Sequence, residues 1–256
     1  MIHFDNVTRR FGTKVAVDQL NLQVSPGEVF AYLGPNGAGK TTSIRMLVGL
    51  LLPSSGAIRL DGLDVVQHPR EAKEVIGFVP DQPELYDKLS GREFLQFVAD
   101  IRGIVGRAQQ ASIDELSEIL ELRDFLDQLT ENYSHGMKQR IAVAAALVHR
   151  PKLLVLDEPM VGLDPRMMRI VKEQLRVRAK QGMSVFISTH TLAMAEEIAD
   201  RIGVIDHGCL QFVGTKDELR SKLADHEASL ENLYLKLTEA AEVAPEPAPI
   251  HLHRPA

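Results

Sequence analysis

The sequence has little of several features that mark particular classes of protein. Its 256 residues contain a single cysteine, Cys209, which excludes an internal disulfide and fits a reducing compartment. There is no basic excess, because 29 Lys and Arg stand against 35 Asp and Glu and give a formal net charge of −6. A nucleic-acid-binding protein usually shows such an excess, so the composition does not indicate that class.

Long apolar runs are also missing. The longest, such as residues 141–148, are far too short to span a bilayer. The amino terminus has neither the basic start nor the long apolar stretch of a signal peptide. If the protein serves a membrane process, we expect the membrane-spanning part to be another chain.

The most informative stretch present fits the pattern G-x-x-x-x-G-K-[ST] of a phosphate-binding loop and runs Gly34, Pro35, Asn36, Gly37, Ala38, Gly39, Lys40, Thr41. An apolar run at 29–33 enters it and predicts a buried strand, and a periodic run at 42–50 leaves it and predicts a helix. In that context backbone N–H groups surround phosphate oxygens at the start of a helix. Lys40 is expected to reach the outer phosphates, and the Thr41 hydroxyl to hold Mg²⁺.

The remaining pattern predicts a mixed α/β protein. Further strands are expected at 2–6, 14–24, 57–60, 76–79, 153–156, 184–188 and 202–206, the first two in an antiparallel sheet. Helices are expected at 71–74, 91–101, 108–122, 122–129, 141–148 and 192–199. Phe11 is expected in the turn after the first strand. Ser134 is expected to be the N-cap of the helix that carries residues 141–148.

A pair of carboxylates follows the continuously apolar run 153–156. Asp157 is placed to fix Mg²⁺ at the carboxyl end of a central strand, where α/β sheets put their chemistry. Glu158 can then polarise an attacking water as a general base. His190 ends the strand expected at 184–188 and is predicted to lie at the same edge of the sheet as Glu158.

The order of these motifs resembles that of the ATP-binding cassette (ABC) ATPases, the motor subunits of ABC transporters. The resemblance covers residues 1–238 and includes Walker A at 34–42, a Q-loop region at 80–82, a signature at 133–137, Walker B at 153–158, a D-loop at 162–164 and the switch residue His190. It implies one α/β domain, a P-loop NTPase (RecA-like) core with an antiparallel β subdomain. An α-helical subdomain is inserted at about 84–150, and a helical extension follows at about 216–238. The tail 239–256 is expected to be disordered.

The same resemblance implies a role for each site residue. Catalysis falls to Glu158, His190 and Lys40. Metal binding falls to Thr41 and Asp157, with Asp81 or Gln82 as a further contact. Nucleotide binding falls to Phe11, Gly34, Pro35, Asn36, Gly37, Ala38, Gly39, Lys40, Thr41, Thr42, Ser134 and Gly136.

Some of these roles extend across two copies of the chain. Phe11 would stack on adenine, whereas Ser134 and Gly136 would meet the γ-phosphate of ATP bound to the other copy. Two copies would therefore enclose two nucleotides, and Asp164 would couple the two sites.

The sequence departs from the usual family pattern in two places. Tyr133, His135 and Met137 replace three residues of the usual signature Leu-Ser-Gly-Gly-Gln. The usual Q-loop glutamine directly follows a proline, whereas Asp81 holds that place here and Gln82 comes next. Which of the two reaches Mg²⁺ is left open. So is whether His135 lies beside the second nucleotide or is a polar surface residue.

The signature and residues 229–238 resemble exporter ATPases of the multidrug, antibiotic-resistance and polysaccharide type. The cofactors implied are ATP and Mg²⁺. The partners implied are a separate six-helix membrane permease and a second copy, with no nucleic acid. The implied place is cytoplasmic, at the inner face of the membrane through the permease. The alternative is a soluble ABC ATPase acting on ribosomes or DNA, which one cassette without a coiled-coil insert disfavours. A nucleotide sensor and an importer also stay open.

Overall fold

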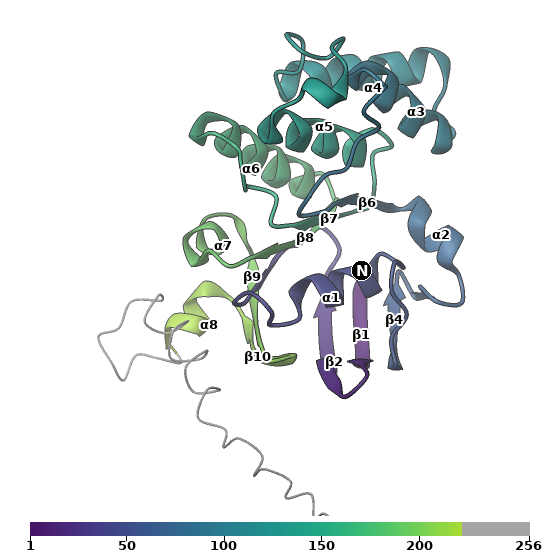
Figure 1. Cartoon of the computed structure of the whole chain (residues 1–256). Helices are drawn as coiled ribbons and strands as arrows, with labels where there is room; N and C mark the ends of the chain where they lie inside the picture. The colour runs from purple at the N-terminus through teal and green to yellow at the C-terminus, as the bar shows by residue number, and fades with distance from the viewer. Residues whose placement is uncertain (222–256) are drawn as a thin grey trace, which may run out of the picture.

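The computed structural model describes residues 1–221, and two sheets form its centre (Figure 1). The larger sheet has six strands in the order β10-β9-β3-β8-β7-β6. These are β3 Val29–Leu33, β6 Ile76–Val79, β7 Leu153–Asp157, β8 Ser184–Thr189, β9 Arg201–Asp206 and β10 Cys209–Gly214. All neighbouring pairs are parallel except β9 and β10, which are antiparallel.

The central strands read as unbroken apolar runs because both faces of the sheet are covered. Every residue of β3, β7 and β8 is buried. Alternate residues enter two separate cores: Ala31 and Leu33 belong to one, whereas Phe30 and Tyr32 belong to the other. This is the pattern expected for a parallel sheet buried between two layers, and it confirms the strands predicted at 29–33 and 153–156.

The smaller sheet is antiparallel and has the strand order β2-β1-β4-β5. Its strands are β1 Ile2–Phe11, β2 Lys14–Val24, β4 Ser55–Leu60 and β5 Leu63–Asp64. The predicted antiparallel pairing is therefore confirmed. Phe11 was expected in the turn, but it is the last residue of β1 and pairs with Lys14.

Eight α-helices are described within residues 1–221: α1 Lys40–Leu47, α2 Pro69–Glu74, α3 Gly91–Ile101, α4 Gly106–Ile119, α5 His135–Leu147, α6 Pro165–Lys180, α7 Leu192–Ile198 and α8 Lys216–Ser221. Helices α3, α4 and α5 lie together at the top of Figure 1, and the chain reaches them after β6 and leaves them into β7. This arrangement supports a helical insertion at about 84–150, whose bounds remain a prediction. No helix of the described part is long and apolar enough to cross a membrane.

Four expected helices differ from those observed, and the one expected at 108–122 is α4 Gly106–Ile119. The helix after the phosphate-binding loop spans α1 and ends at Leu47, because Gly49 takes a positive φ of 69°. The helix expected at 141–148 begins earlier, at His135. The helix expected at 122–129 is wrong, since turns occupy that segment. The carbonyl of Phe125 accepts a hydrogen bond from the Tyr133 hydroxyl, and that of Leu126 accepts one from Arg92 N.

Three of these helices and strands were not predicted: α6, the edge strand β10 and the two-residue strand β5. Helix α6 is strongly charged on its outer side, which hides its buried stripe of Met167, Val171, Leu175 and Ala179. The spacing of that stripe and the N-cap Asp164 before Pro165 are signals that could have found it. Of the extension expected at 216–238, only α8 falls within the described residues, and the tail 239–256 lies outside them.

Candidate functional site

A cleft of about 600 Å³ lies at the carboxyl ends of the central strands. It brings together most of the predicted site: residues of the phosphate-binding loop with Phe11, Asp81, Glu158 and His190. Gln82, in contrast, is exposed and does not line the cleft. The carboxyl edge of a parallel sheet is where α/β proteins bind ligands.

The phosphate-binding loop needs its glycines for close backbone contacts. A Cβ atom on Gly34 would lie 2.4 Å from the carbonyl oxygen of Ile205. A Cβ atom on Gly39 would lie 2.6 Å from the carbonyl oxygen of Ala16, and Gly39 has a φ of 109°. Gly39 is also the N-cap of α1 and offers no side-chain cap, so the amino end of α1 suits an anion such as phosphate.

Lys40 lies in the middle of this site with its ammonium group held in place. Its Nζ donates to the carbonyl oxygens of Gly34, at 2.7 Å, and Pro35, at 3.0 Å. The same atom lies 3.5 Å from Glu158 Oε1, and the side chain is only 6% exposed. Two carbonyl oxygens and one carboxylate thus hold the Lys40 ammonium beside the loop that is expected to receive phosphates.

Glu158 is fixed by both its backbone and its carboxylate. It adopts a φ of 48°, which is uncommon outside glycine and often occurs at functional sites. Its N–H donates to Ser188 Oγ at 3.2 Å. One carboxylate oxygen, Oε2, lies 3.0 Å from His190 Nδ1, and the other faces Lys40. The prediction that His190 and Glu158 share one edge of the sheet is thus confirmed by their contact.

Asp157 is 2% exposed and accepts hydrogen bonds from the Ser188 and Thr41 hydroxyls, the former at 2.5 Å. Burial raises the pKa of Asp157, the two hydroxyl donors oppose this rise, and the neighbouring charge of Asp81 adds to it.

Carboxylate and hydroxyl oxygens are ligands that Mg²⁺ prefers. Among the described residues no group of three or more His, Cys, Asp and Glu could hold a metal. A Mg²⁺ site completed by phosphates needs only one or two carboxylates.

Phe11 forms one side of the cleft and is 48% exposed. The guanidinium carbon of Arg9 lies 4.5 Å from the centre of its ring, a cation–π contact that steadies the ring. An exposed, steadied aromatic ring beside a phosphate-binding loop can stack on a base.

The signature residues, 133–137, do not line the nucleotide cleft. Ser134 is the N-cap of α5, as predicted, and its Oγ accepts from Met137 N at 3.3 Å. Ser134 and Gly136 line a hollow of about 340 Å³, and none of its lining residues is among those of the nucleotide cleft. A single chain therefore does not bring Ser134 and Gly136 to its own phosphate-binding loop.

The signature hollow is built by close contact with residues 162–164. A Cβ atom on Gly136 would lie 2.7 Å from the carbonyl oxygen of Gly162, so this position requires glycine. The His135 ring lies against Gly162, where an added Cβ would be 2.1 Å from its Cδ2. Asp164 caps α6, accepting from Met167 N and Arg166 N, and these hydrogen bonds lower its pKa.

Two further residues were missed by sequence reasoning. Ser188 bonds both the Asp157 carboxylate and the Glu158 N–H, and a serine inside the apolar run 184–189 was its signal. Gln139 is fully buried, and its amide donates to the carbonyl of Pro159, which follows Glu158, at 3.0 Å. It links the signature helix to the end of Walker B, a contact that no local pattern indicates.

The chain is similar in sequence to several known proteins. A family model described as "ABC transporter" matches residues 17–161. The probable multidrug ABC transporter ATP-binding protein YbhF of Escherichia coli is 35% identical over 93% of this chain, which spans 41% of YbhF. The linearmycin resistance ATP-binding protein LnrL of Bacillus subtilis is 36% identical over 87% of this chain and 72% of its own length. The bacitracin transport ATP-binding protein BcrA of Bacillus licheniformis is 39% identical over 82% of this chain and 68% of its own length.

Solved structures show the same fold. One described as an ATP binding subunit of an ABC transporter matches with a TM-score of 0.87 and 29% identity, over 93% of this chain and 99% of its own. The dimeric bacterial ABC transporter cassette MJ0796 matches with a TM-score of 0.78 and 24% identity, over 84% of this chain and 98% of its own.

Proposed function

The chain belongs to the ABC transporter family, and on that premise we propose that it is an ATP-hydrolysing motor subunit that powers export through a separate membrane permease. The observation that carries the proposal is the convergence of Lys40, Glu158 and His190 in one cleft with the phosphate-binding loop. These are the parts that phosphoryl transfer to water needs: a phosphate cradle, a cation and a base.

Each group has a defined task when ATP is bound. The loop and Lys40 bind the phosphates, and Phe11 stacks on the adenine. As general base, Glu158 accepts a proton from the attacking water while the water oxygen bonds to the γ-phosphorus and ADP leaves. His190 orients the Oε2 atom of Glu158. Because Lys40 faces the other oxygen, the Glu158 carboxylate is held between two positive or hydrogen-bonding groups.

We propose that Mg²⁺ is held by Thr41 and Asp157. Asp81 is the better third contact, because it lines the cleft and its charge acts on Asp157, whereas Gln82 does not line it. The ion would supply neutralisation of phosphate charge.

We expect Asp157→Asn to raise the Mg²⁺ concentration needed for half-maximal hydrolysis by about tenfold, as for loss of one charged ligand contact. Hydrolysis measured across a Mg²⁺ titration, with excess chelator as baseline, tests this. The matched control Asp61→Asn changes an exposed aspartate that pairs with Lys152. Equal titration curves for Asp157→Asn and the unaltered protein would contradict the assignment.

We further propose that two copies enclose two ATP molecules, with Ser134 and Gly136 of each copy facing the nucleotide of the other. The support is geometric: the amino end of α5 is capped by Ser134 in a hollow separate from the chain's own cleft. Such a helix end favours an anion.

ATP and Mg²⁺ are expected to shift a Glu158→Gln variant from monomer to dimer in sedimentation. Adding Gly136→Ala should weaken that dimer by about tenfold or more, because the new methyl group meets the Gly162 carbonyl. The matched control is Gly103→Ala, where no atom lies within 4 Å of the added Cβ, although its φ of 74° adds some strain. Equal dimerisation of the Gly136→Ala and Gly103→Ala proteins would argue against a role for the signature.

An export role is supported by the names of the relatives, which refer to multidrug, linearmycin and bacitracin transport or resistance. None of the relatives named here is described as a ribosome or DNA factor, so the soluble alternative has no support. The proposed place is the inner face of the membrane, reached through the permease. The helical insertion at 84–150 and the extension at 216–238 remain part of the proposal.

A further inference from the structure

We propose that Tyr133 is a positioning residue. Its hydroxyl connects the signature serine, Ser134, through hydrogen bonds to the segment that follows Asp81 and leaves the nucleotide cleft. The inference rests on the proposed function, because Ser134 is there assigned to the second nucleotide. Tyr133 stands where the usual signature has leucine, so its hydroxyl is a feature of this chain that the shared chemistry does not require.

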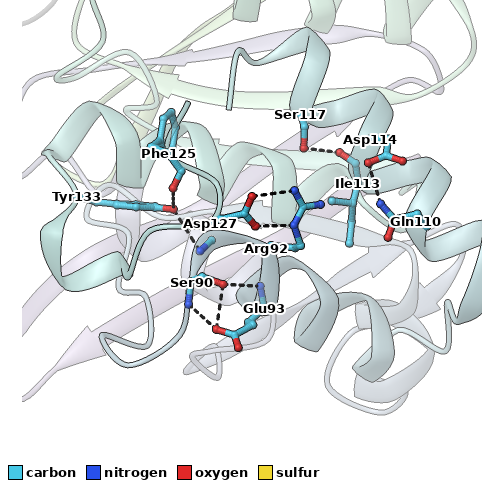
Figure 2. A network of polar contacts seen from close by, with 11 residues as sticks. Ser90, Arg92, Glu93, Gln110, Ile113, Asp114, Ser117, Phe125, Asp127 and Tyr133 are labelled. Carbon is cyan, nitrogen blue, oxygen red and sulfur yellow. Dashed lines mark hydrogen bonds and ion pairs between the residues drawn. The ribbon is translucent and has the colours of Figure 1, made fainter. Parts of the chain in front are cut away.

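The hydroxyl makes two buried hydrogen bonds. It donates to the Phe125 carbonyl at 2.7 Å (Figure 2) and accepts from Gly91 N at 3.2 Å. The tyrosine is 7% exposed, and its ring meets the Phe125 ring edge-on with centroids 5.1 Å apart. A Cβ atom on Gly91 would lie 2.4 Å from the hydroxyl oxygen, so this connection depends on a glycine at that place.

The two hydrogen-bond partners of the hydroxyl, Gly91 and Phe125, belong to segments that are linked to each other by further hydrogen bonds. Ser90 and Glu93 form a capping box at the start of α3, and Arg92 holds Asp127 through two hydrogen bonds of 2.6 and 3.2 Å (Figure 2). The backbone N–H of Arg92 also donates to the Leu126 carbonyl at 2.8 Å. The first turn of α3 and the turns around Phe125 are therefore expected to move together.

These linked segments lie between the two halves of the site along the chain. Asp81 lines the nucleotide cleft, and the chain runs from it in ten residues to Gly91. Ser134 follows Tyr133 directly and caps α5. A shift of the segment after Asp81 can thus reach Ser134 through the Tyr133 hydroxyl, beside the backbone contacts that join residues 86–91 to residues 128–131. A leucine could fill the ring's space, but it could not form either hydrogen bond.

The test compares Tyr133→Phe with Tyr86→Phe, which removes a hydroxyl from an exposed tyrosine of the same region. Tyr133→Phe removes both hydrogen bonds, but Gly91 N and the Phe125 carbonyl each keep a backbone contact with Gln128. We therefore expect the effect of about one net hydrogen bond, which is about two- to tenfold. We expect Tyr133→Phe to lower kcat for ATP by that factor and to leave KM unchanged. Amide hydrogen exchange at residues 134–140 of the ATP-free protein should become faster by a similar factor. Tyr86→Phe should change none of these values.

A double-mutant cycle separates positioning from general stability. If Tyr133 acts through Ser134, Tyr133→Phe should have little further effect on kcat in a Ser134→Ala protein. Additive losses in kcat, or unchanged exchange at residues 134–140, would overturn the proposal. If Tyr133→Phe speeds amide exchange at residues 134–140 but the unaltered protein does not hydrolyse ATP, the proposed function is overturned. The hydrogen-bonded connection through Tyr133 would then still be supported.

Discussion

Replacing Glu158 by glutamine is expected to lower ATP turnover by about 10² to 10⁴-fold while ATP stays bound. The change keeps the size of the side chain and removes its charge and its capacity to act as a base. The P-loop, Lys40 and the helix end of α1 are unaltered, so the phosphate cradle remains. Hydrolysis measured by phosphate release and ATP binding measured by equilibrium titration give the two quantities separately.

The matched control is Glu71→Gln, since Glu71 is an exposed glutamate on α2 that faces His68. It should hydrolyse ATP at the unaltered rate. Ordinary turnover by the Glu158→Gln protein would show that another group activates the water. A loss of binding equal to the loss of turnover would show instead that Glu158 acts mainly by balancing the buried charge of Lys40.

The parts of the site that could be predicted from sequence are those fixed by local rules. Residues 29–33 and 153–156 are apolar throughout because both sides of each strand are buried, and this alone places Asp157 and Glu158 at the carboxyl edge. The glycines of the loop were predicted from the spacing of the motif, although the contacts that require Gly34 and Gly39 are made with Ile205 and Ala16, which lie far along the chain.

The parts that could not be predicted depend on contacts between distant segments. Leu122, Phe125 and Leu126 have helical spacing and are buried, yet the segment forms turns. The Leu122 carbonyl accepts from Leu126 N, which closes a single turn, but the Phe125 and Leu126 carbonyls accept from the distant Tyr133 hydroxyl and Arg92 N. Spacing records only which side chains are buried, so it cannot show where the backbone hydrogen bonds go.

The arrangement of the signature shows the same limit at a larger scale. Ser134 was correctly predicted as an N-cap, because that rule needs only neighbouring residues. Its distance from the chain's own phosphate-binding loop is set by the packing of α5 on β6 and by the contact of Gly136 with Gly162. The sequence pattern therefore identifies the parts of the site, whereas the packing determines which parts share one hollow.

Replacing Lys40 by alanine is expected to weaken ATP binding by roughly 10- to 150-fold, the effect of removing a hydrogen bond to a charged group. The ammonium is 6% exposed and is already held by the carbonyls of Gly34 and Pro35. A phosphate group therefore meets a cation whose position needs little further ordering. Equilibrium titration with ATP measures the change, and thermal unfolding of the same variant shows whether it remains folded.

The control for net charge is Lys152→Ala, because Lys152 is 68% exposed and precedes β7 at the opposite edge of the sheet. A general attraction between positive charge and ATP would weaken binding in both variants, whereas a placed cation weakens it only in Lys40→Ala. Removal of Lys40 also leaves the Glu158 carboxylate without its buried counter-charge. A double variant, Lys40→Ala with Glu158→Gln, should thus recover folding stability relative to Lys40→Ala but not ATP affinity. Recovery of affinity in the double variant would mean that Lys40 serves Glu158 and not the phosphates.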